Sequence, residues 1–587
     1  MTERREEKKS FIKKLLVYLR PYRLQAILAP CFKLLEAAFE LLVPLIMADI
    51  IDVGISSGDT AYILKKCLVL AGLGLCGFAS ATCAQYFSAK AATGATGRLR
   101  HALFAHIQSL SYAELDRLGT ATLVTRMTSD MNQVQTGLNL TLRLLLRSPI
   151  VVFGAMIMAF TIDTRSALIF AVAIPALFAV VFAIMLSCIP LYRRVQTRLD
   201  GVTGAAQENL SGVRVIRAFT REQTETESFA EKTGRLFSAQ QFVGRLSALL
   251  NPLTYVIINL AIVAILRVGG VRVNEGAITQ GQLIALYNYM SQILVELIKF
   301  ANLILNITKS AACAGRISQV LDTKSSMADG AGTLPDGAGA PELEFRHVSF
   351  RYPQAGADAL TDISLCAAPG ETIGVIGGTG SGKSTLANLI PRFYDATEGC
   401  VLVRGEDVKS LQLQALRTRI GVVPQKALLF SGTIRENLRW GNADASDEAL
   451  WDALRAAQAD GVVRDKTGQL DAPVEPGGRN FSGGQRQRLT IARALVRRPE
   501  ILILDDSASA LDFATDAALR KTLPKLPWRP TVVLISQRVS SIRHADRILV
   551  LDDGRMAGLG THAELMSTCP VYQEICRSQE KGEASAS

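Results

Sequence analysis

A glycine-rich run between residues 377 and 384 has the clearest chemical purpose in this sequence. It reads Gly-Gly-Thr-Gly-Ser-Gly-Lys-Ser and has the spacing of a P-loop. A strand-like run, residues 372–376, precedes it, and a helix-like run, residues 385–390, follows it. Glycines let backbone N–H groups curl around phosphate oxygens at a helix N-terminus, so this segment predicts a nucleotide phosphate site. The predicted nucleotide-binding residues here are Gly377, Gly378, Thr379, Gly380, Ser381, Gly382, Lys383, Ser384 and Thr385.

Three side chains in and near this loop have the chemistry to hold a triphosphate and a magnesium ion. Lys383 can neutralise the outer phosphates, and the hydroxyl of Ser384 can ligate Mg²⁺. Asp505 ends a second apolar strand-like run, residues 501–505, and its carboxylate can hold Mg²⁺ directly or through water. The sequence therefore predicts binding of ATP with Mg²⁺.

The order of the remaining motifs resembles the ATP-binding cassette family. Just before the second strand, the sequence matches the family's signature motif, which implies a phosphate-binding helix start that acts across a dimer interface. The matching residues are Ser482, Gly483, Gly484 and Gln485. Tyr352 stands where the family stacks an aromatic ring on adenine. Gln425 matches the Q-loop, which implies a place among the catalytic and metal-binding residues.

The resemblance extends beyond the phosphate site, over most of residues 10–575. Residues 509–512 match the family's D-loop, and residues 208–219 resemble the second cytoplasmic loop of ABC exporters. In this family two cassettes enclose two ATP molecules, and each site joins the P-loop of one chain to the signature of the other. Short coupling segments transmit closure to the membrane helices, and here they are expected near residues 114–122 and 219–227.

Two residues depart from the family pattern at the place where hydrolysis would occur. The family has a Glu after the second strand as the base that orients water, whereas this chain has Asp506. Asp is one methylene shorter, and a carboxylate misplaced by about 1–1.5 Å can cost ~10²-fold in rate. The family's switch histidine is replaced by Gln537, which can hydrogen-bond phosphate but cannot carry positive charge.

These departures lead to a specific prediction for the catalytic residues Asp506, Gln537 and Gln425. The chain's own site is expected to bind ATP and turn over slowly, as in the degenerate-site subunit of a heterodimeric ABC exporter. Its partner would be a second half-transporter chain, whose competent site this chain's signature completes. The alternatives are a homodimeric exporter in which Asp506 suffices as base, a regulatory membrane protein that gates a partner, and a fused importer.

The apolar composition places this site in a membrane protein. Of the 587 residues, 49% are hydrophobic and 20% are charged, which indicates one very apolar part and one ordinary soluble part. A spanning helix needs roughly 20 mainly apolar residues. Six runs meet that length: residues 24–50, 62–87, 138–162, 165–190, 246–272 and 281–308. The predicted fold is a six-helix transmembrane domain followed by an α/β P-loop NTPase cassette.

Charge placement predicts the orientation in the bilayer. The net charge is +11, and the basic residues cluster in the long links 90–135 and 192–244, beside apolar runs. The positive-inside rule therefore places these links and both termini in the cytoplasm of a multi-pass plasma membrane protein. The links keep apolar residues at helical spacing, so the spans should continue as long cytoplasmic helices. A soluble nucleic-acid motor fits this sequence poorly, because the apolar spans would have no role.

Composition shifts predict the domain boundaries. The expected order is an amphipathic elbow helix at 1–20, the transmembrane domain at 21–321, a linker at 322–341, the cassette at 342–579 and a disordered tail at 580–587. Charges inside the spans indicate a cavity or internal pairs. Glu36 and Glu40 share a helix face, and Glu296 and Lys299 can pair. The cargo is expected to be a small amphipathic drug, lipid or peptide, with multidrug export favoured by analogy.

Overall fold

The computed structural model describes residues 17–335, 340–353, 355–507 and 509–584, which form two compact units. The first unit comprises Met1–Gln108 and Ala121–Thr323. The second comprises Ser109–Thr120 and Lys324–Ser587, so it includes a short segment from the helical half of the sequence. The predicted elbow helix lies mostly outside the described residues.

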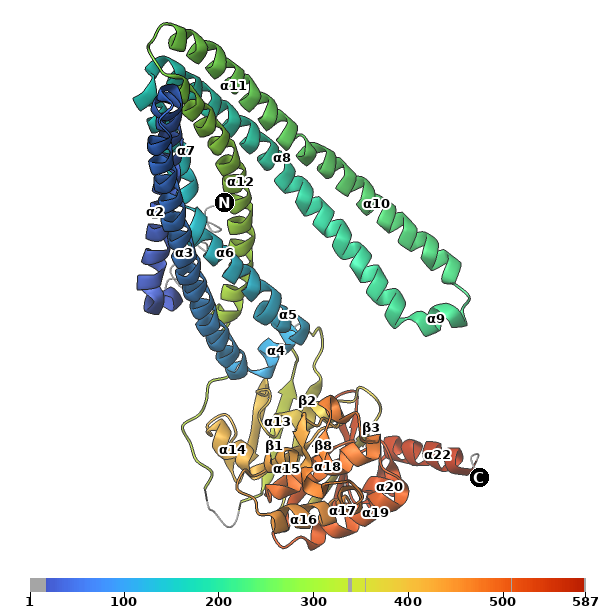
Figure 1. The fold of residues 1–587 in the computed structure, drawn as a ribbon. Coiled ribbons are helices and arrows are strands. Elements are labelled where there is room, and N and C mark those ends of the chain that lie inside the picture. Colours follow the sequence, from blue (N-terminus) through green and yellow to red (C-terminus); the bar gives the residue numbers. More distant parts are fainter. Residues whose placement is uncertain (1–16, 336–339, 354, 508, 585–587) are drawn as a thin grey trace. The chain divides into compact units, whose positions relative to one another are not determined.

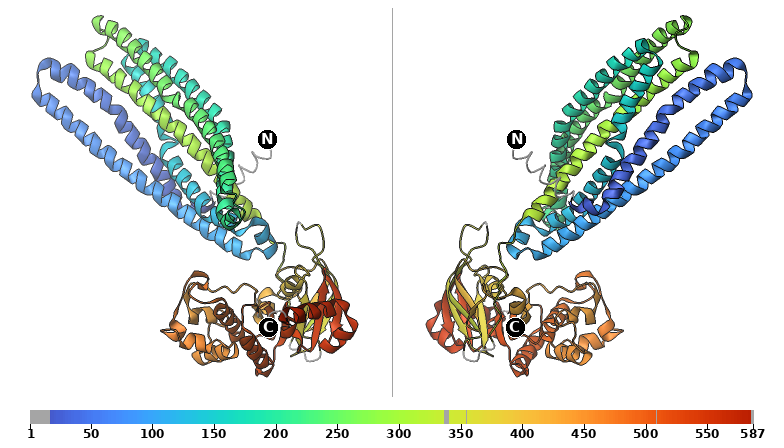
Figure 2. Two further views of the ribbon diagram at one scale, coloured as in Figure 1. Left: turned by 90° about the vertical axis from the view of Figure 1, so that its right-hand side faces the viewer. Right: turned by 90° about the vertical axis from the view of Figure 1, so that its left-hand side faces the viewer.

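Long helices build the first unit (Figure 1). They are α2 (Arg23–Asp49), α3 (Thr60–Ser109), α6 (Met131–Leu144), α7 (Arg147–Ile162), α8 (Thr164–Ser211), α10 (Glu222–Ala248), α11 (Leu250–Asn274) and α12 (Gln280–Asp322). The short helices are α5 (Thr120–Thr125) and α9 (Val213–Ala218), with the 3-10 helix η1 (Arg20–Tyr22) and the π-helices η2 (Ile50–Ile55) and η3 (Arg126–Asp130). Helix α8 packs against α10 and α11, and α12 packs against α2, α6 and α7 (Figure 2).

Five helical stretches of the described residues are long and apolar enough to cross a membrane. They are Thr60–Ser109, Thr120–Ile162, Thr164–Ser211, Glu222–Asn274 and Gln280–Asp322. The first predicted span coincides with α2, a helix of 27 residues, but α2 is not among the five. Its charged residues Lys33, Glu36 and Glu40 lower its apolarity, so length and composition support five of the six predicted spans.

The long links are helical, as predicted from their periodicity. Helix α3 runs for 50 residues and α8 for 48 residues, each well beyond the length that a membrane needs. The first turn, α4 (Tyr112–Leu118), overlaps the predicted coupling segment 114–122. The second turn differs from the prediction, because Gly212 ends α8 and α9 lies at Val213–Ala218. Most of the predicted segment 219–227 therefore belongs to α10.

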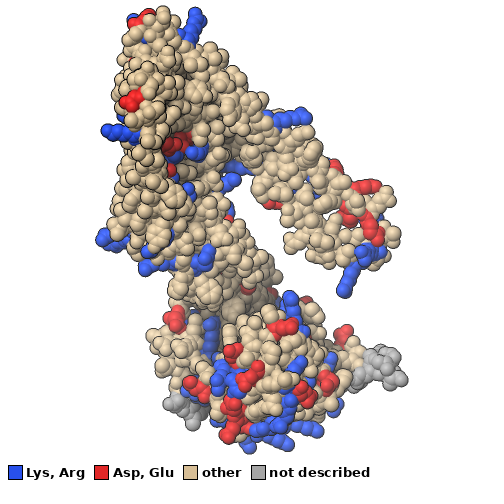
Figure 3. Space-filling view, in the orientation of Figure 1, with Lys and Arg blue, Asp and Glu red and all other residues tan. Residues whose placement is uncertain are grey.

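Charged side chains are unevenly distributed over the surface. Figure 3 shows them sparsely placed over much of the helical first unit and crowded on the second unit and around the α9 end of the long helices. An apolar helix surface with few charges is suited to lipid, whereas a charged surface is suited to water. The pattern agrees with the membrane and soluble parts expected from the sequence.

The second unit contains two larger β-sheets and a small one. The antiparallel sheet has the order β2 (Leu360–Ala367), β1 (Leu343–Phe350), β4 (Glu398–Val403), β5 (Glu406–Asp407). The core sheet has the order β12 (Arg555–Gly560), β11 (Arg547–Asp552), β3 (Thr372–Gly377), β10 (Thr531–Ile535), β9 (Ile501–Asp505), β6 (Ile420–Val423). All its neighbours are parallel except β11 and β12, as predicted for a largely parallel core. Strands β7 (Gly432–Thr433) and β8 (Pro473–Val474) form the small sheet.

Helices cover these sheets. They are α13 (Lys383–Leu389), α14 (Leu413–Arg419), α15 (Ile434–Arg439), α16 (Asp447–Ala456), α17 (Asp460–Arg464), α18 (Gly483–Val496), α19 (Phe513–Thr522), α20 (Val539–Ile542), α21 (His562–Thr568) and α22 (Pro570–Ala584), with the turns η4 (Gln469–Asp471), η5 (Pro476–Gly478) and η6 (Leu523–Lys525). Helix α22 ends at Ala584, so residues 580–584 of the predicted disordered tail are helical, and the rest of that predicted tail lies outside the described residues. Its first residues continue the helix that Tyr572 and Cys576 anchor in the core.

The linker is bound to the cassette at its middle. Helix α12 ends at Asp322 and β1 begins at Leu343, close to the predicted linker bounds of 322–341. Gly332 donates to the carbonyl of Ser410 (2.9 Å) and accepts from Gln412 (2.8 Å). Backbone bonds on both sides of Gly332 therefore hold this part of the linker against the cassette.

Candidate nucleotide-binding and catalytic site

Strand register brings the distant motifs to one edge of the core sheet. Ile535 of β10 pairs with Val375 of β3 and with Asp505 of β9. The carboxyl ends of these three parallel strands are therefore level, and ligands of open α/β sheets bind at such ends. The P-loop follows β3, Asp506 follows β9 and Gln537 follows β10.

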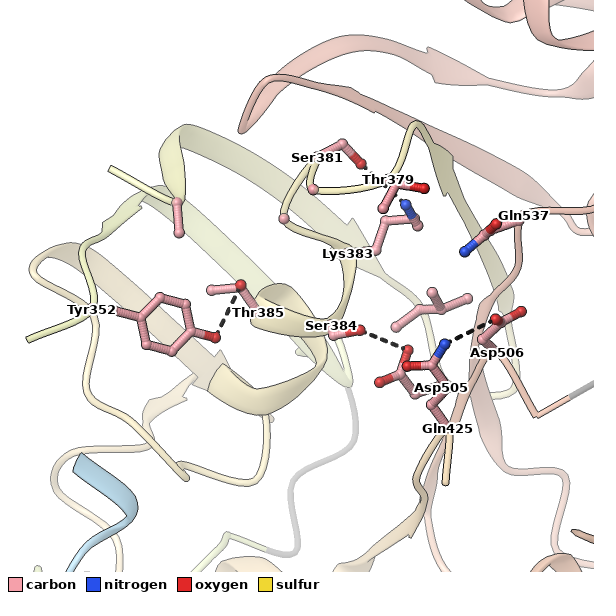
Figure 4. A pocket seen from close by; sticks show the side chains of 14 residues that line it. Tyr352, Thr379, Ser381, Lys383, Ser384, Thr385, Gln425, Asp505, Asp506 and Gln537 are labelled. Atoms are coloured by element: carbon pink, nitrogen blue, oxygen red, sulfur yellow. Dashed lines mark hydrogen bonds between the residues drawn. The ribbon is translucent and has the colours of Figure 1, made fainter. Parts of the chain in front are cut away.

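A cavity of about 320 Å³ opens at this edge (Figure 4). Twelve of the residues predicted from sequence line it: Tyr352, Thr379, Gly380, Ser381, Gly382, Lys383, Ser384, Thr385, Gln425, Asp505, Asp506 and Gln537. The other lining residues are Ala359 and Ile535, small or apolar side chains that no motif pointed to. Gly377 and Gly378 lie in the same loop and accept hydrogen bonds from Lys383 through their carbonyls.

The P-loop is a backbone cradle with a buried lysine beneath it. Lys383 Nζ donates to the carbonyls of Gly377 (2.9 Å) and Gly378 (2.5 Å), and burial lowers the pKa of Lys383 below its usual value. Gly382 has φ +93, and a Cβ there would meet the carbonyl oxygen of Ala359 at 2.6 Å. Only glycine fits that position. A Cβ at Gly380 would meet nothing within 4 Å, so the face of the loop is open to a ligand.

The oxygens suited to a divalent cation lie beside the loop. Ser384 Oγ donates to Asp505 Oδ1 (3.1 Å), and burial raises the pKa of Asp505 above its usual value. No group of three or more His, Cys, Asp or Glu side chains in the described ranges could hold a metal ion alone. Mg²⁺ here would depend on phosphate oxygens and water for its remaining ligands, which is usual for Mg-nucleotide sites. The residues present fit that arrangement.

Asp506 has an unusual backbone conformation that aims its side chain. Its φ is +45, in the left-handed region that Asp tolerates better than most residues. Its N–H donates to the carbonyl of Ile535 (3.0 Å), and its carbonyl accepts from Ser509 Oγ (2.7 Å). Its Oδ2 accepts from Gln425 Nε2 at 3.3 Å. The carboxylate is thus directed at the Q-loop residue, and Figure 4 shows the Gln537 amide on the same side of the cavity.

The predicted adenine-stacking residue is held by its hydroxyl and by neighbouring rings. Tyr352 OH lies 3.1 Å from Thr385 Oγ1. Its ring packs edge-on against Phe350 (4.8 Å) and Tyr394 (5.3 Å between centroids). Edge-to-face contacts of this kind stabilise aromatic pairs by about 0.5–1.5 kcal/mol. Tyr352 therefore has a defined orientation at the rim of the cavity.

The signature residues stand apart from this cavity. Ser482 caps α18: its Oγ accepts from the N–H of Gln485 (3.3 Å), while Gln485 Oε1 accepts from the N–H of Ser482 (3.0 Å). This reciprocal pair is a capping box at the start of a 14-residue helix. Ser482 and Gly483 are exposed. The capping box occupies the N–H groups of Ser482 and Gln485. The role that the resemblance implies for this helix start, binding a phosphate outside this chain's own P-loop site, stays a prediction.

Comparison with known proteins agrees with both halves of this description. The profile of the "ABC transporter transmembrane region" matches residues 26–297, and the profile "ABC transporter" matches residues 360–509. An uncharacterized ABC transporter ATP-binding protein of Mycobacterium tuberculosis is 38% identical over 571 residues, which cover 96% of this chain and 97% of that protein. The chain belongs to the ABC transporter family.

Two further relatives define the type of transporter. An ATP-dependent lipid A-core flippase of Yersinia pestis is 30% identical to this chain over 564 residues, which cover 95% of this chain and 96% of the flippase. The solved structure of a bacterial Atm1-family ABC exporter with ATP bound superposes with a TM-score of 0.80 at 25% identity, covering 96% of this chain and 99% of that one. The protein is a multi-pass membrane half-transporter with the ABC exporter fold, and it hydrolyses ATP.

Motif reasoning missed residues that act through their neighbours. Helix α4 packs on the cassette of the transporter: the Tyr112 ring lies 4.6 Å from that of Phe393, and Tyr394 OH donates to Asp116 Oδ2 (2.5 Å). The side-chain amide of Gln579 in α22 donates a hydrogen bond to the backbone carbonyl of Gln537. The aromatic pair in the sequence at 393–394 was a signal for the first contact. No sequence signal pointed to the second.

Proposed function

We propose that this chain is the degenerate-site half of a heterodimeric ABC exporter. The observation that carries the proposal is the residue after β9: Asp506 stands where a longer Glu serves as base, and it is hydrogen-bonded to Gln425 at 3.3 Å. The short side chain holds its carboxylate close to its own backbone, whose conformation is set by the bonds to Ile535 and Ser509. Water in line with a γ-phosphate would need a carboxylate that reaches further.

Gln537 supports the same proposal. Its side chain lines the cavity and can donate a hydrogen bond to a phosphate oxygen, but it stays neutral at all pH values. A histidine there could gain a proton and stabilise developing negative charge. This chain therefore keeps the groups that bind ATP and lacks two groups that accelerate its cleavage.

The chain's own residues have distinct roles in the proposed binding step. Lys383 leaves its loop carbonyls for the outer phosphates, Tyr352 stacks on adenine, and Ser384 and Asp505 hold Mg²⁺. When bound, Mg²⁺ neutralises phosphate charge. The exposed capping box at Ser482 offers N–H groups to a nucleotide held by a second half-transporter, where the fast hydrolysis occurs.

We infer that the cargo is an amphipathic, lipid-like molecule. Six charged side chains from three helices of the first unit form a connected cluster: Lys33, Glu36, Glu40, Arg147, Glu296 and Lys299. Three are basic and three acidic, and the side chains of Glu40 and Lys299 remain 38% and 45% exposed. Charged groups beside apolar helices suit a molecule with a polar head and an apolar body. The similarity to a lipid A-core flippase supports that class over other drugs or peptides.

The proposed placement is the plasma membrane, with both termini and the cassette in the cytoplasm. The basic links that continue α3 and α8 support this orientation through the positive-inside rule. Transport would then run outward, as in exporters with this domain order.

ATPase measurements on the purified chain, alone and with a co-purified partner, test the degenerate-site proposal. We expect turnover by the chain alone to be about 10²-fold below that of the two-chain complex, because its carboxylate is misplaced for water activation. Fast turnover by the chain alone that Asp506→Ala abolishes would show a competent homodimer and overturn the proposal. Transport of a labelled lipid in vesicles separates an exporter from a regulatory protein.

A further inference from the structure

The C-terminal helix α22 reaches the segment that follows β10, where Gln537 lies. Gln579 Nε2 donates to the carbonyl of Gln537 (2.6 Å), and Gln579 Oε1 accepts from the N–H of Val539 (2.8 Å). One amide side chain therefore bridges two backbone groups on either side of Arg538. Because an amide is planar and uses both ends here, it fixes the position and the plane of this segment.

The switch segment, residues 536–539, is tied to the cassette at its start, where the N–H of Ser536 donates to the carbonyl of Val375 (3.1 Å) and the Arg538 guanidinium donates to the carbonyl of Ser509 (3.5 Å). It links β10 to α20, a helix of only four residues, and helices this short are unstable in isolation. The N–H of Val539 is the first of α20 and has no carbonyl partner within the helix. The side chain of Ser536 supplies one local bond, accepting from the N–H of Arg538 (3.0 Å). Gln579 supplies the missing partner for Val539 from outside.

Helix α22 is a rigid support for this bond. Tyr572 and Cys576 are buried in the cassette core, and Tyr572 OH lies 2.8 Å from His562 Nδ1. Gln579 lies three residues after Cys576, so the two side chains are neighbours along one face of the helix. The anchored part of α22 therefore determines where the Gln579 amide lies.

The two ends of Gln537 face different structures. Its carbonyl is bound by Gln579, while its side-chain amide lines the nucleotide cavity, where Figure 4 shows it near Lys383 and Asp506. Without the bond to the carbonyl, the exposed residue 537 could rotate its peptide and move the amide out of the cavity. The contact thus orients a cavity side chain through its own backbone.

We propose that Gln579 is a positioning residue for ATP: it holds the switch segment so that the Gln537 amide faces the γ-phosphate. This inference rests on the proposed role of Gln537 at this site. It predicts a nucleotide-selective effect, because ADP has no γ-phosphate for Gln537 to contact. A residue that only stabilised the fold would affect both nucleotides alike.

The test compares nucleotide affinities of full-length Gln579→Ala in lipid nanodiscs. Dissociation constants are measured for Mg-AMP-PNP, which keeps the γ-phosphate, and for Mg-ADP. We expect AMP-PNP to bind about 3- to 10-fold more weakly, the effect of losing roughly one hydrogen bond to phosphate, with less than twofold change for ADP. Gln579→Glu should show the same loss, since a carboxylate cannot donate to the carbonyl of Gln537.

Matched variants separate positioning from general stability. Gln573→Ala lies on the same helix and removes a side-chain amide that donates to the carbonyl of Met566 (2.9 Å), so it should leave both affinities unchanged. Val539→Pro removes the other bond at the first position of α20, where proline is tolerated and the preceding residue is already extended. It should reproduce the selective loss if Gln579→Ala fails to fold.

Gln537→Ala distinguishes failure of this inference from failure of the site assignment. It should weaken AMP-PNP as Gln579→Ala does, and the double variant should be no worse, because both changes remove one contact. If Gln537→Ala weakens AMP-PNP but Gln579→Ala and Val539→Pro do not, the positioning role is overturned. If Gln537→Ala has no effect, the proposed role of Gln537 is overturned as well. Equal loss of AMP-PNP and ADP would also contradict positioning.

Discussion

At the scale of single residues, the proposed slow hydrolysis rests on the reach of the Asp506 carboxylate and on the neutral charge of Gln537. Asp506 lies in a left-handed backbone conformation and is bonded to Gln425, so its side chain has a defined direction. The direction of the Asp506 carboxylate is compatible with a catalytic role, but the Asp side chain is one methylene shorter than the Glu that the family has at this position. Gln537 shares the cavity without bringing positive charge. Restoring a longer carboxylate at position 506 and a histidine at position 537 should therefore change the rate of ATP hydrolysis more than the affinity for ATP.

The double variant Asp506→Glu, Gln537→His tests this geometric reasoning. We expect ATP turnover at this chain's site to rise by about 10- to 100-fold, because the longer carboxylate reaches the water and the imidazole can carry charge. The measurement is ATPase activity of the chain purified alone, with nucleotide affinity determined in parallel. An unchanged rate with intact affinity would argue against the misplacement of Asp506.

At the scale of elements, the helices of the first unit are joined by a buried ion pair. Arg147 of α7 donates to Glu296 of α12 (2.5 Å) and to Glu40 of α2 (2.6 Å). The side chains of Arg147 and Glu296 are only 6% and 3% exposed. Removing one partner of such a pair leaves an unpaired buried charge, which is far more costly than losing both.

Arg147→Ala should destabilise the protein by about 3–5 kcal/mol, because Glu296 would remain buried with only Lys299 and the Ser148 hydroxyl as partners. Thermal unfolding of the detergent-solubilised protein measures this as a lower Tm. The double variant Arg147→Gln, Glu296→Gln should recover much of the loss. Arg235→Ala is the matched control, since its pair with Glu231 on α10 is exposed and should contribute about 0–1 kcal/mol. Equal effects at Arg147 and Arg235 would contradict the ion-pair argument.

A second contact at this scale joins α4 to the cassette next to the nucleotide site. Tyr394 packs against Tyr352 and donates to Asp116 of α4. Burial and the nearby Asp116 carboxylate raise the pKa of Tyr394 well above its usual value, so its hydroxyl remains a donor at physiological pH. This places the Tyr394 ring between Tyr352, the predicted adenine-stacking residue, and helix α4, which follows the long helix α3.

Tyr394→Phe removes the bond to Asp116 and keeps the ring against Tyr352. We expect the ratio of cargo-stimulated to basal ATPase activity to fall about 2- to 10-fold, consistent with the loss of one hydrogen bond between α4 and the cassette. Asp116→Asn should weaken the same contact, and the two changes together should not add. Tyr572→Phe, which removes the hydroxyl facing His562 elsewhere in the cassette, is the control. A similar fall in that control would mean that the contact has no special role.

At the scale of the whole molecule, one chain holds the parts of two different sites. Its P-loop cavity and the exposed start of its signature helix α18 are separate features of the cassette. In the proposed two-chain complex, a second half-transporter would supply the signature for this chain's cavity and the P-loop for its signature. If the second site is the competent one, turnover of the complex should depend strongly on the start of α18.

Ser482→Arg in this chain should lower ATPase activity of the two-chain complex by about 10²-fold, because bulk and lost capping disturb the N–H groups that face the partner's nucleotide. The measurement uses the complex reconstituted in vesicles. Ser446→Arg is the control, because the Ser446 side chain also accepts an N-cap hydrogen bond, from the N–H of Ala449 in α16, away from the signature. Turnover that survives Ser482→Arg would contradict the assignment of the fast site.

The amino-acid sequence by itself determined the phosphate chemistry and the order of the domains. The P-loop and the signature are each a run of neighbouring residues, and Asp505 ends an apolar strand. Short sequence patterns were therefore enough to predict these groups. The apolar runs likewise predicted membrane helices, because length and composition decide insertion. Two expectations still differed from the structure. Three charged residues within α2 set this helix apart from the five stretches that are apolar enough to cross a membrane. The second cytoplasmic turn was expected at residues 219–227, but Gly212 ends α8 and the turn is formed by α9.

Only the tertiary structure decided which distant side chains meet. Arg147 and Glu296 are 149 residues apart, Tyr394 and Asp116 are 278 apart, and Gln579 and Gln537 are 42 apart. No local propensity encodes such pairs, because they depend on how whole helices and strands pack against one another. The candidate catalytic groups could be named from sequence, while the contacts that orient them required the folded chain.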